Sequence, residues 1–264
     1  MFIRGKRFEL KDPLISIITI VLNAEAHVEQ TIRSVLSQTY GNIEYIIIDG
    51  GSTDRSLEII NRYRNQVDYF ISEKDEGIAD AMNKGSARAT GDYLIFLHAD
   101  DYFANDRSLE NALAFLNDGT DILACSILFG KQLEVYKPKG FGVWTNFKQG
   151  LYHQGVFCRR QLLQDLRGFD TQFRIAMDYD FFLRAYRRSA AIVKAPVILT
   201  VMRDNGISSR RDWRNLKFRF AEEKRVHEKN CHSLLMGLLY KSYWLLYPPY
   251  RYLSYVTKLR TDRS

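Results

Sequence analysis

The sequence has few cysteines and lacks the long apolar runs of membrane-spanning proteins. Its three cysteines, Cys125, Cys158 and Cys231, lie far apart and form no Cys-x-x-Cys pair. This spacing argues against a disulfide framework or a zinc ribbon and favours a reducing compartment. No window holds 18 uninterrupted apolar residues, so we expect no spanning helix. The basic N-terminal segment also lacks the apolar core of a signal peptide.

Two common nucleotide-binding patterns are missing as well. The sequence contains no Gly-x-x-x-x-Gly-Lys motif, and no Gly-x-Gly-x-x-Gly motif follows the first apolar run, residues 14–22. The first absence argues against a P-loop phosphate site, and the second argues against a dinucleotide-dependent dehydrogenase.

The composition is that of an ordered globular protein with an uneven distribution of charge. The 264 residues are 46% apolar and 26% charged, which suits one α/β domain with additions or two small domains. The net charge is +7, but from Arg203 onward 14 Lys and Arg stand against 6 Asp and Glu. The preceding residues are therefore close to neutral, and the basic character belongs to the C-terminal part.

Apolar runs alternate with amphipathic segments along the first hundred residues. We predict strands at residues 14–22, 43–49, 68–72 and 93–97, with helices at 24–40, 55–63 and 77–89 between them. Asn23 is predicted to cap the first helix. This alternation indicates right-handed crossovers and a mainly parallel sheet. Further extended segments are expected at 121–129, 151–158 and 190–202, and a further helix at 179–188.

Carboxylates follow the fourth predicted strand, where the apolar run 93–97 ends in His98, Asp100 and Asp101. Ligands of such sheets bind at the carboxyl ends of the strands. Adjacent carboxylates repel one another, so we expect a cation nearby. Asp100 and Asp101 offer the hard oxygen ligands that Mg²⁺ or Mn²⁺ prefers, which predicts a metal-diphosphate site. His98 is either a further ligand or a packed, hydrogen-bonded imidazole.

Two groups in the second half have both a structural and a functional interpretation. Asp178 lies in the acidic stretch that opens the helix predicted at 179–188. It either complements the helix dipole or acts as a general base at a pocket rim. His153 and Gln154 interrupt an apolar run, either as satisfied buried side chains or as ligand contacts. The residue pattern leaves both choices open.

Four stretches, taken together, resemble the family 2 glycosyltransferases of GT-A fold. They occur in the family's order over about residues 14–185 and occupy residues 16–40, 43–60, 75–103 and 168–184. The resemblance implies a Rossmann-like, mainly parallel sheet flanked by helices. It implies a catalytic domain over 1–205, followed by a helical, basic and aromatic extension over 206–264.

The resemblance also implies an activity. Such an enzyme transfers a sugar, with inversion, from a nucleotide-diphosphate sugar to a saccharide or polyprenyl-linked acceptor. The most similar group builds bacterial cell-surface polysaccharides. Residues that match family positions near the donor nucleotide are Thr19, Asn23, Asp49, Ser52, Asp54 and Asp100. Among them, Asp49 is the expected contact of the base.

The metal and base positions are implied in the same way. The stretch "HADD" stands where the family has Asp-x-Asp-Asp, so Asp100 and Asp101 inherit the binding of a divalent cation (Mn²⁺ or Mg²⁺) and diphosphate, and His98 replaces the first Asp. Asp178 inherits the catalytic base, beside Met177 where many members have Glu. His153 and Gln154 are candidate contacts of the acceptor or the diphosphate.

Rival functions remain at this point. A nucleotide-sugar-binding module without transfer activity is the alternative, favoured by His98 and Met177 and opposed by the retained acids. Nucleic acid is not an expected partner.

The C-terminal stretch 234–260 mixes leucines, tyrosines and basic residues, which suits attachment to the inner face of the cell membrane from the cytoplasm. Packing of this stretch on the catalytic domain is the competing interpretation.

Overall fold

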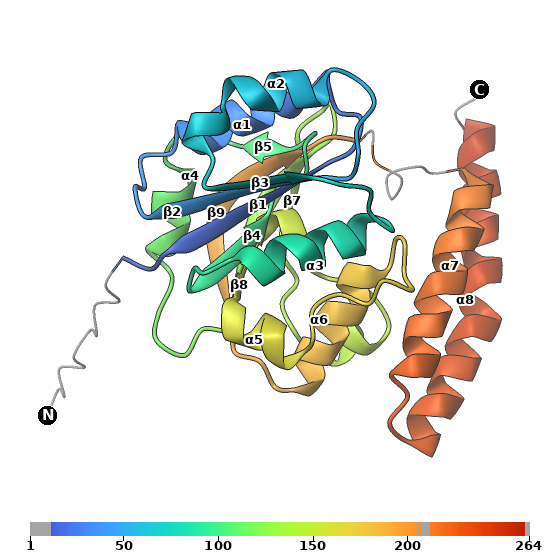
Figure 1. The fold of residues 1–264 in the computed structure, drawn as a ribbon. Coiled ribbons are helices and arrows are strands. Elements are labelled where there is room, and N and C mark those ends of the chain that lie inside the picture. The colour runs from blue at the N-terminus through green and yellow to red at the C-terminus, as the bar shows by residue number, and fades with distance from the viewer. Residues whose placement is uncertain (1–11, 205, 207–211, 262–264) are drawn as a thin grey trace, which may run out of the picture.

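A single mixed sheet forms the centre of the molecule in the computed structural model, which describes residues 12–204, 206 and 212–261 (Figure 1). The strand order is β3-β2-β1-β4-β8-β6-β9-β5, and β7 pairs with β6 outside this path. The strands are β1 (Ile15–Val21), β2 (Ile43–Asp49), β3 (Tyr69–Ser72), β4 (Tyr93–Phe96), β5 (Tyr102–Phe103), β6 (Ile122–Phe129), β7 (Glu134–Tyr136), β8 (Val156–Arg159) and β9 (Ile192–Met202).

The first four strands form the parallel half of the sheet, as predicted. β1 pairs in parallel with β2 and β4, and β2 pairs in parallel with β3. The central strands β1 and β4 are buried along their whole length, as expected for central parallel strands, whereas the edge strand β3 is partly exposed. The predicted α/β class is confirmed.

The second half of the sheet adds antiparallel pairing. β8 runs antiparallel to both β4 and β6, whereas β6 and β9 pair in parallel. The strand expected over 151–158 begins only at Val156, because His153–Gly155 forms a 3₁₀ turn. That turn directs His153 and Gln154 away from the strand ladder and toward the site described below.

Helices cover both faces of the sheet. α1, α2 and α4 lie on one face and α3, α5 and α6 on the other (Figure 1). The helices are α1 (Val28–Leu36), α2 (Ser56–Arg62), α3 (Ile78–Arg88), α4 (Ser108–Leu113), α5 (Arg160–Asp165), α6 (Met177–Arg187), α7 (Trp213–Lys229) and α8 (Leu234–Thr261).

The predicted helix cap at Asn23 is wrong. α1 begins at Val28 with His27 in the N-cap position, while Asn23 adopts a left-handed turn with φ of 50°. The Asn23 side chain instead accepts the Thr53 N–H at 2.8 Å, which ties the loop after β1 to the loop after β2.

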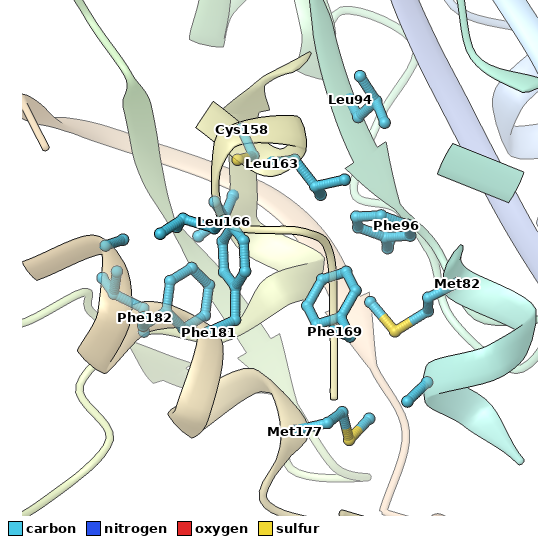
Figure 2. Close-up of a cluster of buried hydrophobic side chains, with 14 of the residues drawn as sticks. Met82, Leu94, Phe96, Cys158, Leu163, Leu166, Phe169, Met177, Phe181 and Phe182 are labelled. Carbon is cyan, nitrogen blue, oxygen red and sulfur yellow. The ribbon is translucent and has the colours of Figure 1, made fainter. Parts of the chain in front are cut away.

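The core on the α3–α6 face fixes the elements that carry the site. Phe96 of β4 packs edge-to-face against Phe169, with ring centroids 5.2 Å apart, and Phe169 in turn lies 5.0 Å from Phe181 of α6 (Figure 2). Gly85 lets α3 approach β1, because a Cβ there would lie 2.4 Å from Cγ2 of Ile18. Burial of each large side chain stabilises the fold by about 1.5–3 kcal/mol.

α7 and α8 form a helical pair beside α6 (Figure 1). Aromatic rings join the two helices: His227 of α7 stacks on Tyr240 of α8 at 4.3 Å, and Trp213 lies 4.9 Å from Tyr252. The predicted C-terminal helices are therefore present. Among the helices that the structure describes, none has the length and apolarity needed to cross a membrane.

Candidate active site

A cavity of about 510 Å³ opens where the sheet meets the helical pair, a size that suits a small-molecule ligand. The loop after β4 lines one wall with Asp100 and Asp101, and the first turn of α6 contributes Asp178. Arg219 of α7 and Arg251 of α8 line a further wall. The predicted metal residues and the predicted base therefore share one cavity.

Arg203 holds the loop that carries the adjacent carboxylates and places a positive charge near them. The Arg203 main-chain N–H donates to Oδ1 of Asp101 at 3.0 Å, and its guanidinium donates to the carbonyl oxygen of Asp100. Asp101 is 2% exposed, and burial, followed by the charge of Asp100, raises its pKa well above the usual range. Thr31 of α1 anchors the same loop by donating to the carbonyl of Asp101 at 2.6 Å.

The donor set of this loop fits a divalent cation. One ring nitrogen of His98 and one carboxylate oxygen each from Asp100 and Asp101 lie within 4.8 Å of one another. Carboxylate oxygens are the ligands that Mg²⁺ and Mn²⁺ prefer, and imidazole is accepted by Mn²⁺-type ions. Asp100 and His98 are partly exposed and line the cavity, so an ion held by these residues would be accessible from the cavity.

A chain of side chains connects the metal-type cluster with the predicted base. Nε2 of His98 lies 3.0 Å from Nε2 of His153, and Nδ1 of His153 lies 3.4 Å from Oδ2 of Asp178. Burial, and then the neighbouring His153, lowers the pKa of His98 well below its usual value. His98 is therefore a neutral imidazole, and one ring donates to the other. Gln149 donates a further hydrogen bond to Oδ2 of Asp178.

The two predicted contacts of the acceptor or diphosphate, His153 and Gln154, both line the cavity. His153 lies between His98 and Asp178, whereas the Gln154 side chain hydrogen-bonds the Asp101 carboxylate. The Gln154 carbonyl accepts from Oγ1 of Thr200 in β9 at 2.9 Å. Both residues thus contact the acidic groups directly.

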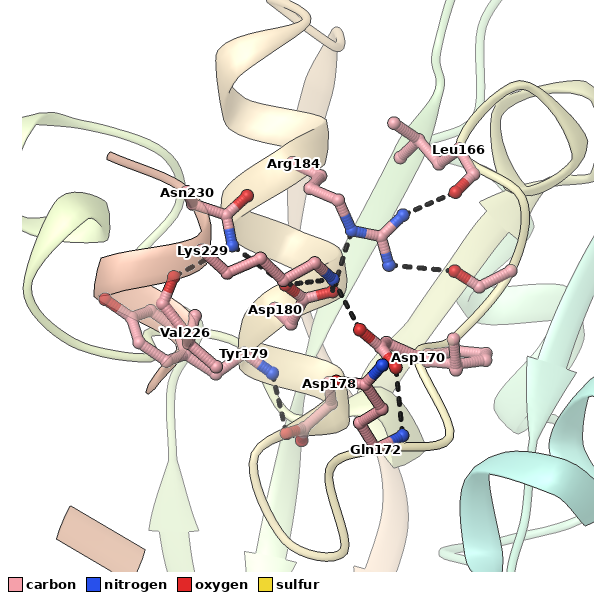
Figure 3. Close-up of polar contacts among 12 residues, drawn as sticks. Leu166, Asp170, Gln172, Asp178, Tyr179, Asp180, Arg184, Val226, Lys229 and Asn230 are labelled. Carbon is pink, nitrogen blue, oxygen red and sulfur yellow. Dashed lines mark hydrogen bonds and ion pairs between the residues drawn. The ribbon is translucent and has the colours of Figure 1, made fainter. Parts of the chain in front are cut away.

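Asp178 and Asp180 have opposite environments although only one residue separates them. Asp178 is the second residue of α6 and faces the cavity. Asp180 is fully buried on the other side of the helix, where it binds Arg184 at 2.8 Å, Lys229 at 3.1 Å and Asn230 at 2.8 Å (Figure 3). Only Asp178 is in position to contact a substrate.

The residues expected near the donor nucleotide form a second cluster at the ends of β1 and β2. The Asn23 N–H donates to Oγ of Ser52 at 2.8 Å, and Oδ2 of Asp54 accepts the Glu25 N–H at 3.0 Å. Asp49 is fully buried and accepts from the N–H groups of Gly51 and Ser52, both at 3.0 Å. The cluster holds the two loops together.

Thr19 lies deeper, inside the core. It is fully buried and its Oγ1 is 3.2 Å from the hydroxyl of Tyr45. Five of the residues expected near the donor nucleotide are not among the described residues that line the cavity: Thr19, Asn23, Asp49, Ser52 and Asp54. Their contacts with a nucleotide stay predictions.

The sequence analysis did not identify several residues that line the cavity. Arg203 directly follows β9, so the rule that ligands bind at strand ends could have pointed to it. Gln149 lies in a loop without any motif, and Arg219 lies in the middle of α7. Neither carries a local signal, and only the tertiary structure brings them to the cavity.

Comparison with known proteins identifies the class. The family model described as glycosyl transferase family 2 matches residues 16–193, so the chain belongs to glycosyl transferase family 2. A PGL/p-HBAD biosynthesis glycosyltransferase of Mycobacterium bovis is 30% identical over 188 residues, which cover 69% of this chain and 73% of the relative. An uncharacterized glycosyltransferase of Haemophilus influenzae is 50% identical over 107 residues, 39% of this chain and 42% of the relative.

Solved structures agree on the fold. Mannosyltransferase PcManGT from Pyrobaculum calidifontis, in complex with GDP-Man and Mn²⁺, superposes with a TM-score of 0.68 at 18% identity, covering 95% of this chain and 75% of the other. S. aureus TarS 1–349 in complex with UDP-GlcNAc superposes with a TM-score of 0.63 at 18% identity, covering 81% of this chain and 70% of TarS. The protein is a glycosyltransferase of GT-A fold.

Proposed function

We propose that the protein transfers a sugar, with inversion, from a nucleotide-diphosphate sugar to a hydroxyl of a saccharide or polyprenyl-linked acceptor. The observation that carries this proposal is the shared cavity, in which Asp100 and Asp101 form one wall and Asp178 another. The nucleotide sugars bound by PcManGT and TarS support a donor of this class.

In this proposal the leaving group is stabilised at the loop after β4. The departing nucleoside diphosphate gains negative charge in the transition state. Asp100 and Asp101, with His98 as the third donor, would hold a divalent cation, Mn²⁺ or Mg²⁺, that neutralises this charge. Arg203 keeps the loop in place from the end of β9.

Asp178 would act as the general base. Direct displacement with inversion needs a base on the face opposite the leaving group, within hydrogen-bond reach of the acceptor hydroxyl. Asp178 accepts from Tyr179 N–H at 2.8 Å through Oδ1, while His153 and Gln149 contact Oδ2. These partners orient the carboxylate without pairing it to a lysine or arginine.

The outward surface of α8 supports a membrane-attached enzyme. This surface, here termed the leucine face, exposes Leu234, Leu235, Leu238, Leu239, Leu245, Leu246 and Leu253. Leu234 is 92% and Leu245 73% exposed, and the exposed Lys241 lies between them in the sequence. Exposed apolar side chains beside basic ones suit the surface of an anionic bilayer.

We propose that the protein acts in the cytoplasm, at the inner face of the cell membrane, in a pathway that builds a cell-surface polysaccharide. The proposed division of the chain is a catalytic domain over 1–205 and a helical, membrane-associating extension over 206–264. Because Arg251 of α8 lines the cavity, the extension would hold the site close to a lipid-linked acceptor.

A thermal-shift panel of UDP-, GDP- and dTDP-sugars with and without Mn²⁺ tests the donor class. A ligand at about 100 times its dissociation constant stabilises the fold by about 2.7 kcal/mol, a shift of roughly 5–10 °C. Transfer from the best donor to saccharide and polyprenyl phosphate acceptors then tests catalysis. Donor binding without any transfer would instead favour the alternative of a non-catalytic nucleotide-sugar-binding module.

A further inference from the structure

A buried glutamate of α7 holds the backbone segment that precedes the proposed base. Glu222 is 1% exposed, although it lies on a helix of the C-terminal extension. Its carboxylate accepts three consecutive main-chain N–H groups, from Arg174 at 2.9 Å, Ile175 at 2.7 Å and Ala176 at 2.9 Å. Ala176 is the N-cap residue of α6, and Asp178 follows two residues later.

The placement of this carboxylate has a physical reason. Ala176 has no side chain that could cap α6, and unpaired main-chain N–H groups are costly when buried. A carboxylate pairs with several N–H donors at once, and the positive end of the helix dipole favours its charge. Glu222 thus replaces a local cap with a contact from a helix about 46 positions further along the chain.

Tyr179 and Asp180, in the first turn of α6, are also fastened to α7 and to its C-cap residue Asn230. The hydroxyl of Tyr179 lies 2.7 Å from Nε2 of His227, and Asp180 is held by Lys229 and Asn230 (Figure 3). The residues on both sides of Asp178 are therefore fixed by α7. Among the residues that the structure describes, the hydrogen-bond partners of the Asp178 carboxylate are Gln149, His153 and the Tyr179 N–H, which all lie outside α7, and Asp178 lines the cavity.

We propose that Glu222 is a positioning residue for catalysis, which sets the place of Asp178 through the N–H groups of residues 174–176. This inference rests on the proposed role of Asp178 as the base. It gives α7 a role in catalysis in addition to the proposed role of the C-terminal extension in membrane attachment. General-base catalysis depends on the distance between the carboxylate and the acceptor hydroxyl, and a misplacement of about 1 Å can lower the rate by about 100-fold.

The test compares Glu222→Gln with Glu228→Gln, which makes the same charge change at an exposed position of α7. A glutamine keeps the size but turns an NH₂ group toward main-chain donors. We expect kcat of Glu222→Gln to fall by about 10- to 100-fold with KM for the donor unchanged. Glu222→Asp, which keeps the charge, should retain more activity, and Glu228→Gln should behave like the wild-type enzyme.

A double-mutant cycle separates this inference from the proposed function. If Glu222 acts through Asp178, then Glu222→Gln should cause little further loss in an Asp178→Asn background. Independent, multiplying losses would overturn the inference, as would a normal kcat of Glu222→Gln beside an inactive Asp178→Asn. A normal kcat of Asp178→Asn would instead refute the role of the base itself.

Hydrogen exchange gives a readout that needs no turnover. In the full-length protein, the amides of residues 174–176 should exchange slowly, and Glu222→Gln should speed their exchange while leaving the strands of the sheet protected. Unchanged exchange in this segment would overturn the inference even if activity fell. Should Glu222→Gln fail to fold, the same comparison is made with Glu222→Asp, where we expect a smaller increase in the exchange of the same amides.

Discussion

The main-chain N–H of Arg203 donates to Oδ1 of Asp101 across a sequence separation of 102 positions. This contact explains how two adjacent carboxylates can end a buried strand. The donor is a main-chain group, so the bond does not depend on the Arg203 guanidinium. The guanidinium of Arg203 is used separately, on the Asp100 carbonyl, so the loop is held at two points while the Asp100 carboxylate faces the cavity.

We predict that catalysis depends on a divalent cation held by this loop. Asp100→Asn and Asp101→Asn should each abolish most turnover and weaken donor binding, because an amide oxygen carries no charge to hold the ion. Circular dichroism and the melting temperature should show that both variants remain folded. Isothermal titration with Mn²⁺ measures the loss of metal binding, and full activity in excess EDTA would refute the prediction.

We predict that Asp178→Asn separates donor binding from turnover. The substitution keeps the size of the side chain and removes its basicity, so kcat should fall by roughly 10²–10⁴-fold. The thermal shift with the donor should match that of the wild-type enzyme. Asp180→Asn is the matched comparison: it breaks the contacts to Lys229 and Arg184, so it should lower the melting temperature instead. NMR of the product must show an inverted anomeric centre.

The parallel half of the sheet was predictable because each of its strands is encoded locally. β1 and β4 are predominantly apolar runs that polar residues follow, and α1 between them has a clear apolar face. The antiparallel half was less predictable. β8 has only four residues, and its partner across the sheet is set by distant contacts such as Leu94 with Cys158.

The residues of the candidate site likewise fall into a group that the sequence predicts and a group that it does not. Asp100 and Asp178 could be predicted, since each stands at the end of a recognisable element and within a family-like motif. Glu222 and Gln149 could not be assigned roles, because their partners are main-chain groups and a carboxylate on distant segments, whereas Arg203 follows a strand end, where the rule for ligand binding applies. Asn23 misled the prediction of a helix cap, because its amide side chain serves an inter-loop contact instead.

We predict that the leucine face binds anionic vesicles. A variant with Leu238, Leu239, Leu245 and Leu246 changed to Gln should lose at least tenfold in cosedimentation with phosphatidylglycerol vesicles, because each buried leucine contributes about 1.5–3 kcal/mol. Leu133→Gln, at an exposed leucine of the β6–β7 turn, is the control. Equal pelleting of the fourfold variant would refute attachment. If the wild type instead forms a dimer and does not bind vesicles, and the fourfold variant is monomeric, the leucine face binds a second copy of the chain.

The last prediction concerns His227 of α7, which contacts both α6 and α8. Nδ1 of His227 lies 2.9 Å from Nε1 of Trp244, and Nε2 lies 2.7 Å from the hydroxyl of Tyr179. Indole N–H is only a donor, so Nδ1 must accept and the ring must be neutral. Burial, and then the charge of Arg187, lowers the pKa of His227 to about 3.

This lowered pKa makes the fold sensitive to acid. Above about pH 6.5 the imidazole is neutral in both states, and the stability that it contributes is fully present. Below that pH only the unfolded chain takes up the proton, so the free energy of unfolding should fall by about 2 kcal/mol between pH 7.5 and pH 5. His98, whose pKa is also lowered, adds to the slope in the same direction. Urea denaturation of wild type, His227→Gln and the exposed control His232→Gln isolates the His227 contribution. The free energy of unfolding of His227→Gln should be lower than that of wild type at pH 7.5. On acidification it should fall by about 2 kcal/mol less than that of wild type, because the proton uptake of His227 is missing. His232→Gln should follow wild type. Identical pH slopes for His227→Gln and wild type would show that His227 does not carry this sensitivity.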